Sequence, residues 1–317
     1  SNWQGLADVT SVMQTQRGLG ASKMSAPSVG GTINIVTKGL DAKRGGSFSY
    51  SLGDNGYNKV TFSVSTGLMD NGWALTVLGS HRKGDGYVQG TFFESYNYFV
   101  NLSKRINDSH QLSLTAFGSP QKHNKRSSAD GLTIEGWQEV RNWMGEKDRY
   151  KYNPTFGYDS NGKVRSSNLN QYHKPQISLS HIWQIDYKSS LSTSAYVSLA
   201  NGGGYSGQGR GTYNGTSISH TSWYGSTNGI VNTLFRKADG TFAYDEIEEM
   251  NRQSTTGSNM VMSKSNNSHE WYGLVSTYRN ELIPQKFTLT AGLDIRYYIG
   301  HHNNEIIDLY GGEYFMD

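Results

Sequence analysis

Residues 287–296 read FTLTAGLDIR, and their alternation decides the fold of this chain. The odd positions from Phe287 to Ile295 are all apolar, whereas the even positions carry Thr, Thr, Gly, Asp and Arg. Successive side chains of a β-strand point to opposite faces, so residues two apart share a face. The segment therefore predicts a strand with one apolar face and one small, polar or charged face.

The same alternation recurs along the chain after Gly46. It predicts nine strands, at about residues 46–52, 58–67, 73–81, 92–104, 110–119, 175–186, 191–201, 270–282 and 286–299. Several exceed the five or six residues that are usual in globular proteins. They match the ~9–11 residues with which a tilted strand crosses a bilayer. No stretch approaches the roughly 18 apolar residues of a membrane-spanning helix.

The connections between these strands alternate in length. Short segments rich in turn-forming residues lie near positions 70, 107, 187 and 284. Long connections lie between them, at about residues 82–91, 120–174 and 202–269. Short turns on one rim and long loops on the other are typical of outer-membrane barrels. The alternative is a soluble all-β protein, in which short and long connections have no reason to alternate.

The composition excludes several classes of function. The 317 residues include no Cys, which removes disulfides, thiolate catalysis and zinc–thiolate sites. The net charge is only +3, and no basic run is long enough to follow a phosphate backbone, so nothing indicates a nucleic-acid partner. Hydrophobic residues make up 35% of the chain while Tyr reaches 21, which fits amphipathic strands joined by polar loops.

The segment before residue 40 has a different character. Arg17 and Gly18 open a region rich in Gly and Ser, which leads into VGGTINIVTK at residues 29–38. The adjacent Gly30 and Gly31 indicate a close backbone approach or a positive φ. The β-branched run that follows predicts a strand. It lacks the clean alternation of the later strands.

This segment resembles the C-terminal end of the plug domain of TonB-dependent outer-membrane receptors. In that family an Arg-Gly pair precedes a Gly-Gly-x-Ile-Asn-Ile-Val-Thr-Lys strand, and the first barrel strand follows. The matching positions here are Arg17, Gly18, Gly30, Gly31, Asn34, Thr37 and Lys38. The step from Gly18 to Leu19 departs from the more usual Gly-Pro. The strict motif covers residues 16–38, and barrel-like sequence continues through the rest of the chain.

The resemblance implies an all-β architecture of two parts. Residues 1–40 would form the C-terminal end of a plug, and residues 41–317 the N-terminal part of an antiparallel transmembrane β-barrel with long extracellular loops. The family barrel has 22 strands, so nine strands do not close it, and no open edge is tolerated in lipid. We therefore expect the chain to be truncated at both ends, without its signal peptide and TonB-contacting segment.

The resemblance also implies a location and a function. The expected protein is a multi-pass barrel of the bacterial outer membrane, in contact with lipid and, through the missing N-terminal segment, with the TonB complex. Its expected activity is TonB-dependent import of a scarce nutrient, with no enzyme chemistry, no catalytic residue and no cofactor. Metal chelates, cobalamin, haem, glycans and peptides all remain open as substrates. The alternatives are a passive pore or a barrel enzyme, and neither would carry the block at residues 30–38.

Candidate ligand contacts lie in the two longest loops. Residues 133–145 show helical spacing of apolar side chains, with Thr133 as a cap and Gly145 at the end. Trp143 falls off the apolar stripe and is a candidate for ligand contact, as are four aromatic residues of the next loop: Tyr205, Tyr213, Trp223 and Tyr224. Arg17 has two interpretations, a plug–wall latch paired with a barrel carboxylate or a cation exposed to the lumen.

Three further segments carry weaker expectations. The glycine-rich residues 201–211 lack the ending of a phosphate loop and predict a mobile surface loop. The acidic residues 245–249 predict a solvated stretch rather than a calcium site. His301 and His302 point to opposite faces if they lie in a strand, so we assign no metal site to them.

Overall fold

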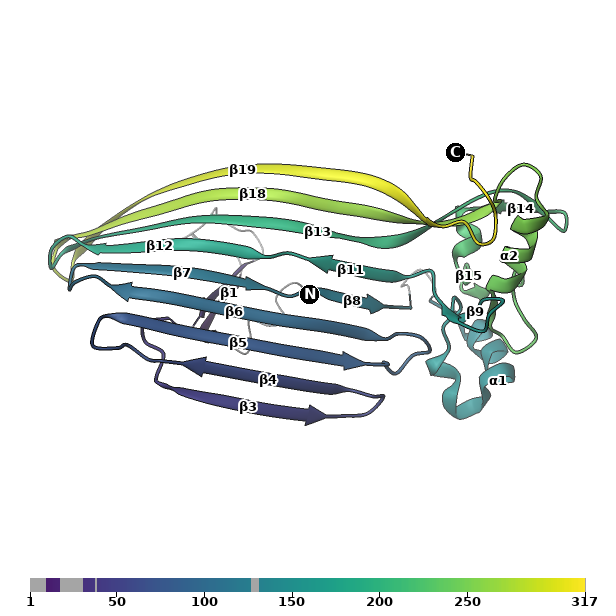
Figure 1. Ribbon diagram of the computed structural model, residues 1–317, viewed down its shortest axis with the longest axis horizontal. Coiled ribbons are helices and arrows are strands. Elements are labelled where there is room, and N and C mark those ends of the chain that lie inside the picture. The colour runs from purple at the N-terminus through teal and green to yellow at the C-terminus, as the bar shows by residue number, and fades with distance from the viewer. Residues whose placement is uncertain (1–9, 18–30, 38, 127–130, 317) are drawn as a thin grey trace.

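Long antiparallel strands dominate the fold (Figure 1). In this computed structural model the described residues are 10–17, 31–37, 39–126 and 131–316, and the side chains of residues 12, 16, 17 and 31–34 lie outside that description. No helix among these residues is long and apolar enough to cross a membrane. The strands form one large twisted sheet, here called the wall, with a group of loops and short helices at one end.

The wall is a meander in which each crossing pairs antiparallel with the next. Within the described residues the chain crosses it nine times, which confirms the nine predicted strands. The crossings are β3 (Gly45–Leu52), β4 (Asn58–Ser65), β5 (Trp73–Gly84), β6 (Phe93–Arg105), β7 (His110–Gly118) with β8 (Gln121–Asn124), β11 (Leu169–His173) with β12 (Gln176–Gln184), β13 (Ser189–Tyr213), β18 (Met260–Ile283) and β19 (Phe287–Asp308).

Two of these crossings are interrupted at the same level of the wall. Pro120 separates β7 from β8, and Pro175 separates β11 from β12. Proline has no N–H to donate to a ladder, so it is found at edges and irregularities of sheets. Both prolines still accept hydrogen bonds, from Tyr96 N at 2.9 Å and from Leu199 N at 3.3 Å. The breaks therefore leave the neighbouring strands connected.

The two faces of the wall differ in chemistry. One face, here called the apolar face, carries a row of register partners on successive strands: Val64, Val77, Val100, Ala116, Ile177, Val197, Tyr272 and Tyr297. The adjacent row points to the other face, here called the polar face: Ser65, Thr76, Asn101, Thr115, Ser178, Tyr196, Gly273 and Arg296. The alternation seen in each strand therefore lines up across the whole sheet.

Side-chain hydrogen bonds connect the polar face. Asn101 Nδ2 donates to Ser113 Oγ and to Thr115 Oγ1, both at 2.9 Å, and Ser103 Oγ donates to Asn101 Oδ1 at 2.7 Å. Asn101 and Ser103 are almost fully buried. Buried polar groups require such partners, and the small uncharged side chains of this face provide them.

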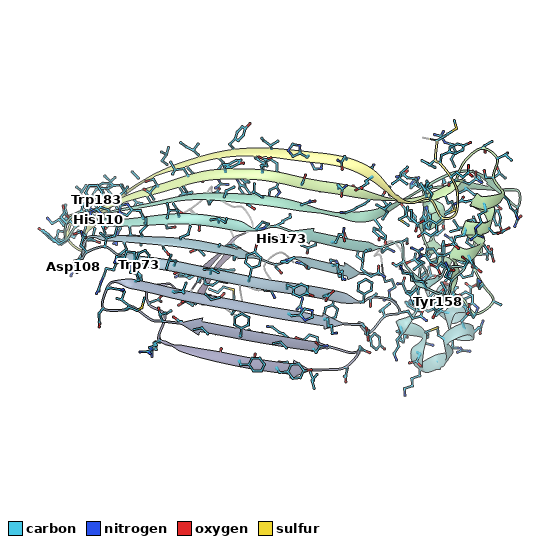
Figure 2. All side chains as sticks on the ribbon, viewed as in Figure 1. Trp73, Asp108, His110, Tyr158, His173 and Trp183 are labelled. Carbon is cyan, nitrogen blue, oxygen red and sulfur yellow. The ribbon has the colours of Figure 1, made fainter. Side chains whose placement is uncertain are left out.

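The connections divide between two ends of the wall as predicted. Short turns lie at the end where Trp73, His110 and Trp183 gather, and the long connections lie at the other end (Figures 1 and 2). His110 stacks on Trp183 with ring centroids 5.6 Å apart. From Trp73 to His81, a rise of ~3.3 Å per residue and a tilt of ~40° give the apolar face a height of about 20 Å. This height is close to the apolar band of an outer-membrane barrel.

A separate hairpin precedes the wall. Strand β1 (Thr10–Arg17) pairs only with β2 (Gly31–Thr37) among the described residues, in antiparallel register with Met13 opposite Ile35. Figure 1 shows β1 behind the wall and inclined to its strands. The prediction that residues 31–38 form a strand outside the wall is confirmed for residues 31–37. Gly18, Gly30 and Lys38 lie outside the described residues, as does the side chain of Arg17.

The loops at the far end form a lobe of their own. This loop lobe comprises residues 131–168 and 214–259. Its elements are α1 (Ile134–Asp148), η3 (Arg149–Lys151), β9 (Gly157–Tyr158), β10 (Val164–Arg165), β14 (Thr216–Ser219), η4 (His220–Trp223), β15 (Ser226–Thr227), β16 (Ile230–Val231), β17 (Phe242–Ala243) and α2 (Tyr244–Gln253). Strands β10, β9 and β17 form a small sheet in that order.

The predicted limits of the two longest loops were wrong in four places. Residues 121–124 and 169–173 of the predicted loop 120–174 belong to the wall, as β8 and β11. Residues 202–213 and 260–269 of the predicted loop 202–269 extend β13 and β18. The glycine-rich segment is thus a strand and not a surface loop. Its glycines serve close packing, since a Cβ on Gly207 would overlap the Trp223 indole and one on Gly202 would overlap Tyr172.

The two helices of the lobe bear on the predicted helix at residues 133–145 and on the predicted acidic stretch at residues 245–249. Thr133 caps α1, accepting a hydrogen bond from Gly136 N at 3.2 Å, as predicted. Gly145 interrupts α1 with φ +74°, and a further turn follows it. The expectation of a solvated acidic stretch at 245–249 was wrong for Glu248. This residue lies buried on α2, where its carboxylate accepts from Ser160 N at 3.1 Å and pairs with Arg252 at 3.3 Å.

Candidate functional site

Aromatic side chains build the core of the loop lobe. Trp223 is 2% exposed, donates its Nε1–H to Gln208 O at 2.9 Å, and has its ring 5.2 Å from that of Tyr310. Phe242 and Tyr244 pack edge to face at 4.9 Å. Residues of η4, β17, α2 and the segment after β19 thus share one core. Burial of such rings, with their polar atoms bonded, gives the lobe a fixed shape.

A partly buried arginine connects three positions of the lobe. Arg236 donates to the carbonyl oxygens of Asn232 at 3.1 Å, Gly240 at 2.9 Å and Gly225 at 3.0 Å. Its guanidinium also lies 5.5 Å from the centre of the Phe242 ring. Burial lowers the pKa of this guanidinium. The carbonyl oxygens stabilise its charge, because hydrogen bonds to ionised groups are the strong ones.

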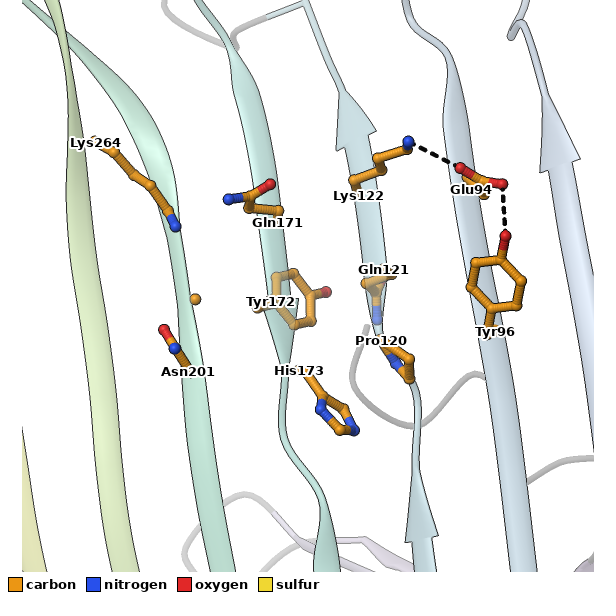
Figure 3. Close-up of a pocket in the computed structure, with 11 residues that line it drawn as sticks. Glu94, Tyr96, Pro120, Gln121, Lys122, Gln171, Tyr172, His173, Asn201 and Lys264 are labelled. Atoms are coloured by element: carbon orange, nitrogen blue, oxygen red, sulfur yellow. Dashed lines mark hydrogen bonds and ion pairs between the residues drawn. The ribbon is translucent and has the colours of Figure 1, made fainter. Parts of the chain in front are cut away.

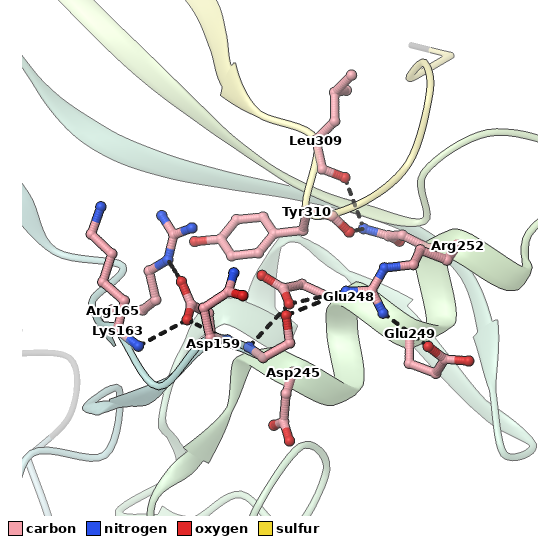
Figure 4. A network of polar contacts seen from close by, with 12 residues as sticks. Asp159, Lys163, Arg165, Asp245, Glu248, Glu249, Arg252, Leu309 and Tyr310 are labelled. Carbon is pink, nitrogen blue, oxygen red and sulfur yellow. Dashed lines mark hydrogen bonds and ion pairs between the residues drawn. The ribbon is translucent and has the colours of Figure 1, made fainter.

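A polar network joins the lobe to the end of the wall (Figure 4). Arg165 donates to Asp159 at 2.9 Å and to Asp308, the last residue of β19, at 3.1 Å. Asp159 also accepts from Lys163 N and Asn161 N, each at 2.9 Å. Burial alone would raise the pKa of Asp159, but these amides and the guanidinium outweigh it and hold the pKa below its ordinary value. The network fixes the β9–β10 turn against the wall.

The five aromatic residues proposed from sequence as ligand contacts occupy different environments. Trp143 lies 5.6 Å from the Tyr152 ring and packs against Gly240, and Tyr213 stacks on Phe235 at 4.9 Å. Tyr205 also packs against the lobe core. Trp223 is buried, whereas Tyr224 is 44% exposed. The core thus encloses the Trp223 ring, although the sequence made it a candidate for ligand contact. Tyr224 is the exposed member of the set.

A patch of cations and aromatic rings on α1, η3 and the nearby chain was missed from sequence. Its members, here called the cation–aromatic patch, are Tyr87, Arg126, Trp137, Arg149, Tyr150 and Lys151. Arg149 lies 4.8 Å from the Tyr150 ring centre, Lys151 lies 5.6 Å from that of Tyr87, and Arg126 lies 5.5 Å from that of Trp137. A guanidinium or ammonium group can pair with an anionic ligand group, and a neighbouring ring can stack on a flat one. The alternation Arg149-Tyr150-Lys151-Tyr152 was the available signal.

Carboxylates balance part of this charge. Glu146 pairs with Arg149 at 2.6 Å and Asp148 with Lys151 at 2.9 Å. The hydrogen bond from Lys151 lowers the pKa of Asp148, so this carboxylate is ionised at neutral pH. Tyr150 is half exposed. The patch thus offers an open ring with cations already held beside it.

A large cavity lies elsewhere, on the wall itself (Figure 3). It has a volume of about 540 Å³, and its lining includes Glu94, Tyr96, Lys122 and His173. Glu94 pairs with Lys122 at 2.9 Å. Glu94 and Tyr96 share the face of Val100, so the cavity belongs to the apolar face, above its hydrophobic rows. It faces away from the hairpin, so it is not placed to receive a ligand inside the barrel.

Comparison with known proteins agrees with this architecture. No protein-family model and no curated protein matches the chain. Among solved structures, the ferric-catecholate import receptor Fiu of E. coli K12 covers 96% of this chain at a TM-score of 0.58 and 12% identity. The ferric citrate transporter FecA covers 96% at 0.60 and 14%, and the ferripyoverdine receptor of Pseudomonas aeruginosa covers 94% at 0.56 and 10%.

These structures are TonB-dependent outer-membrane receptors, which are transport proteins and not enzymes. The likeness shows that the chain has their fold, as a partial all-β barrel with long antiparallel strands. The chain spans 42% of the length of the first receptor, 36% of the second and 33% of the third.

Proposed function

We propose that this chain is part of a TonB-dependent transporter, which imports a scarce nutrient across the bacterial outer membrane and catalyses no bond chemistry. The observation that carries the proposal is the hairpin β1–β2, which stands apart from the wall and lies against its polar face. In a closed barrel, such a hairpin occupies the lumen. Neither a passive pore nor a barrel enzyme requires it.

The proposal divides the chain into two parts. Residues 1–40 form the end of the plug, with the motif at Arg17, Gly18, Gly30, Gly31, Asn34, Thr37 and Lys38. Residues 41–317 form barrel wall and extracellular loops, with the apolar face in contact with outer-membrane lipid. The energy for transport comes from the TonB complex.

We further propose an anionic, aromatic ferric chelate as the substrate class. Two observations support it: the cation–aromatic patch, and the likeness of the fold to receptors for ferric catecholate, ferric citrate and ferripyoverdine. Tyr224 and the patch residues Tyr150 and Arg149 are the proposed contacts. Trp143, Tyr205, Tyr213 and Trp223 shape the lobe from within. Cobalamin, haem, glycans and peptides are the alternative outcomes of the test.

Uptake in living cells tests the function. Cells that express the full-length protein should accumulate radiolabelled iron as a catecholate chelate, and an otherwise identical strain without TonB should bind the chelate but not accumulate it. Equal uptake in both strains would indicate a passive pore. If the chelate is neither bound nor taken up, the same pair of strains should be tested with haem, cobalamin and oligosaccharides. TonB-dependent uptake of one of these would retain the transporter and replace the substrate class.

A further inference from the structure

On strands β5 to β7, an apolar cluster interrupts the polar face. Leu78, Phe99 and Phe117 are register partners on β5, β6 and β7, in a row that begins with Ser47 and Ser63 and continues to Gln176. Leu78 is 3% exposed and Phe99 1% exposed, and Phe117 packs against them. The neighbouring polar-face positions on these strands include Thr76, Asn101 and Thr115, so large apolar side chains here need a partner that removes them from water.

The hairpin provides this partner. Ile35 of β2 packs against the cluster that Leu78 and Phe99 form. The next residue, Val36, is 44% exposed, because adjacent side chains of a strand point to opposite sides. Strand β2 therefore presents Ile35 to the wall, and Val36 points to its other side.

A cavity with polar side chains in its lining adjoins this contact. It has a volume of about 390 Å³ and is bordered by Leu78, by Ser11 of β1 and by wall residues that include Ser47, Ser63, Ser65 and Thr76. Asp41 and Lys43 border the same cavity. The apolar contact is therefore small, and space lined by hydroxyl groups adjoins it.

We infer that Leu78, Phe99 and Phe117 are positioning residues, which hold the plug in the closed barrel by receiving Ile35. This inference rests on the proposed function. A hydrophobic contact has no preferred direction and leaves no charge or hydrogen-bond donor unpaired when it separates. The plug can thus be released by a pull at another point, while water from the adjoining cavity enters.

A reversible cross-link tests the inference directly. The chain has no Cys, so a pair introduced by Ile35→Cys and Phe99→Cys has no competing thiol in these 317 residues. We expect oxidation to link the pair and to abolish uptake while chelate binding persists, and reduction to restore uptake. The matched control is Val36→Cys with Phe99→Cys, which should not link. Failure of the first pair to link, or full uptake by the linked protein, would overturn the inference.

A second experiment measures how well the plug closes the barrel. In liposomes, the full-length Ile35→Ser protein should conduct ions several-fold more than the wild type, whereas Val36→Ser should match the wild type. Phe99→Ser should behave as Ile35→Ser does. Equal conductance of Ile35→Ser and wild type would contradict the inference. The proposed function is judged separately, by TonB-dependent uptake in the wild type, so failure of one is not confused with failure of the other.

Discussion

The wall and the loop lobe are built in opposite ways. In the wall, apolar side chains such as Phe62 and Leu114 are 48% and 43% exposed, while Asn101 and Ser103 are buried. In the lobe, Trp223, Phe242 and Tyr244 are buried around a conventional core. The same chain therefore contains one region that is stable only with hydrocarbon around it and another that folds as soluble domains do. This difference separates the proposed membrane-contacting surface from the proposed site of ligand contact.

The largest effect should follow the loss of the lobe's central ring. Trp223→Ala removes a buried indole and its hydrogen bond to Gln208, which should destabilise the lobe by about 3–5 kcal/mol. Limited proteolysis of intact cells should then cut within residues 214–259, while the amount of assembled barrel stays unchanged. Tyr224→Ala is the matched control, with an exposed neighbouring ring. Loss of barrel assembly in Trp223→Ala would contradict this comparison, because it would show that the wall depends on the lobe core for its assembly.

The next effect should appear on the wall. Arg at position 114 enters the apolar face and should cost about 2–4 kcal/mol in bilayers. Arg at position 115 enters the polar face, where water and hydroxyl groups solvate it, and should cost much less. Equilibrium folding of Leu114→Arg and Thr115→Arg into bilayers measures both. A one-residue shift of register exchanges the two faces, so the opposite order of losses would refute the assignment.

The polar network should make the lobe sensitive to acid. Because the folded-state pKa of Asp159 is depressed, its stabilisation is complete above the ordinary carboxyl range near ~3.9 and is lost as pH falls through the folded-state value. Asp159→Asn should weaken the lobe at neutral pH by about 1–3 kcal/mol. It should also flatten the acid dependence of proteolysis in the β9–β10 turn. An unchanged acid profile in this variant would exclude Asp159 as the titrating group.

The smallest change should be confined to ligand binding. Tyr150→Ala removes a half-exposed ring, so the stability of the lobe should change by less than about 0.5 kcal/mol. Loss of one ring–ligand contact of about 1 kcal/mol should weaken chelate binding roughly five-fold. Binding titrations on the purified full-length protein measure this, with Tyr158→Ala as an exposed control outside the patch. Equal weakening in both variants would remove the patch as a specific contact.

The wall was predictable from sequence because its signal is local and repeated. The alternation at residues 287–296 and in the other strands arises because each strand is apolar on only one face. The lengths of the connections indicated that short turns lie at one end of the wall and long loops at the other. The same reasoning failed at residues 202–213. There, glycines indicated a loop, but the structure uses them so that Trp223 and Tyr172 can approach the backbone of β13. Such contacts join segments far apart in the chain, and no local pattern reveals them.

The candidate site was predictable only in part, for the same reason. An aromatic residue in a long loop is equally suited to a core or to a ligand, and sequence did not separate Trp223 from Tyr224. The patch at Leu78, Phe99 and Phe117 was likewise hidden. It becomes visible only when strand register places the three side chains in one row beneath Ile35.

The central claim, that the apolar face of the wall meets lipid, has one direct test. Spin labels placed singly in the full-length protein in bilayers report access to oxygen, which concentrates in hydrocarbon, and to a polar relaxation agent, which remains in water. Labels at Phe62, Leu114, Val197 and Leu289 should favour oxygen, and labels at the neighbours Ser63, Thr115, Ser198 and Thr290 should favour the polar agent or be shielded from both. Equal access at neighbouring positions, or the reverse pattern, would contradict the membrane-barrel account.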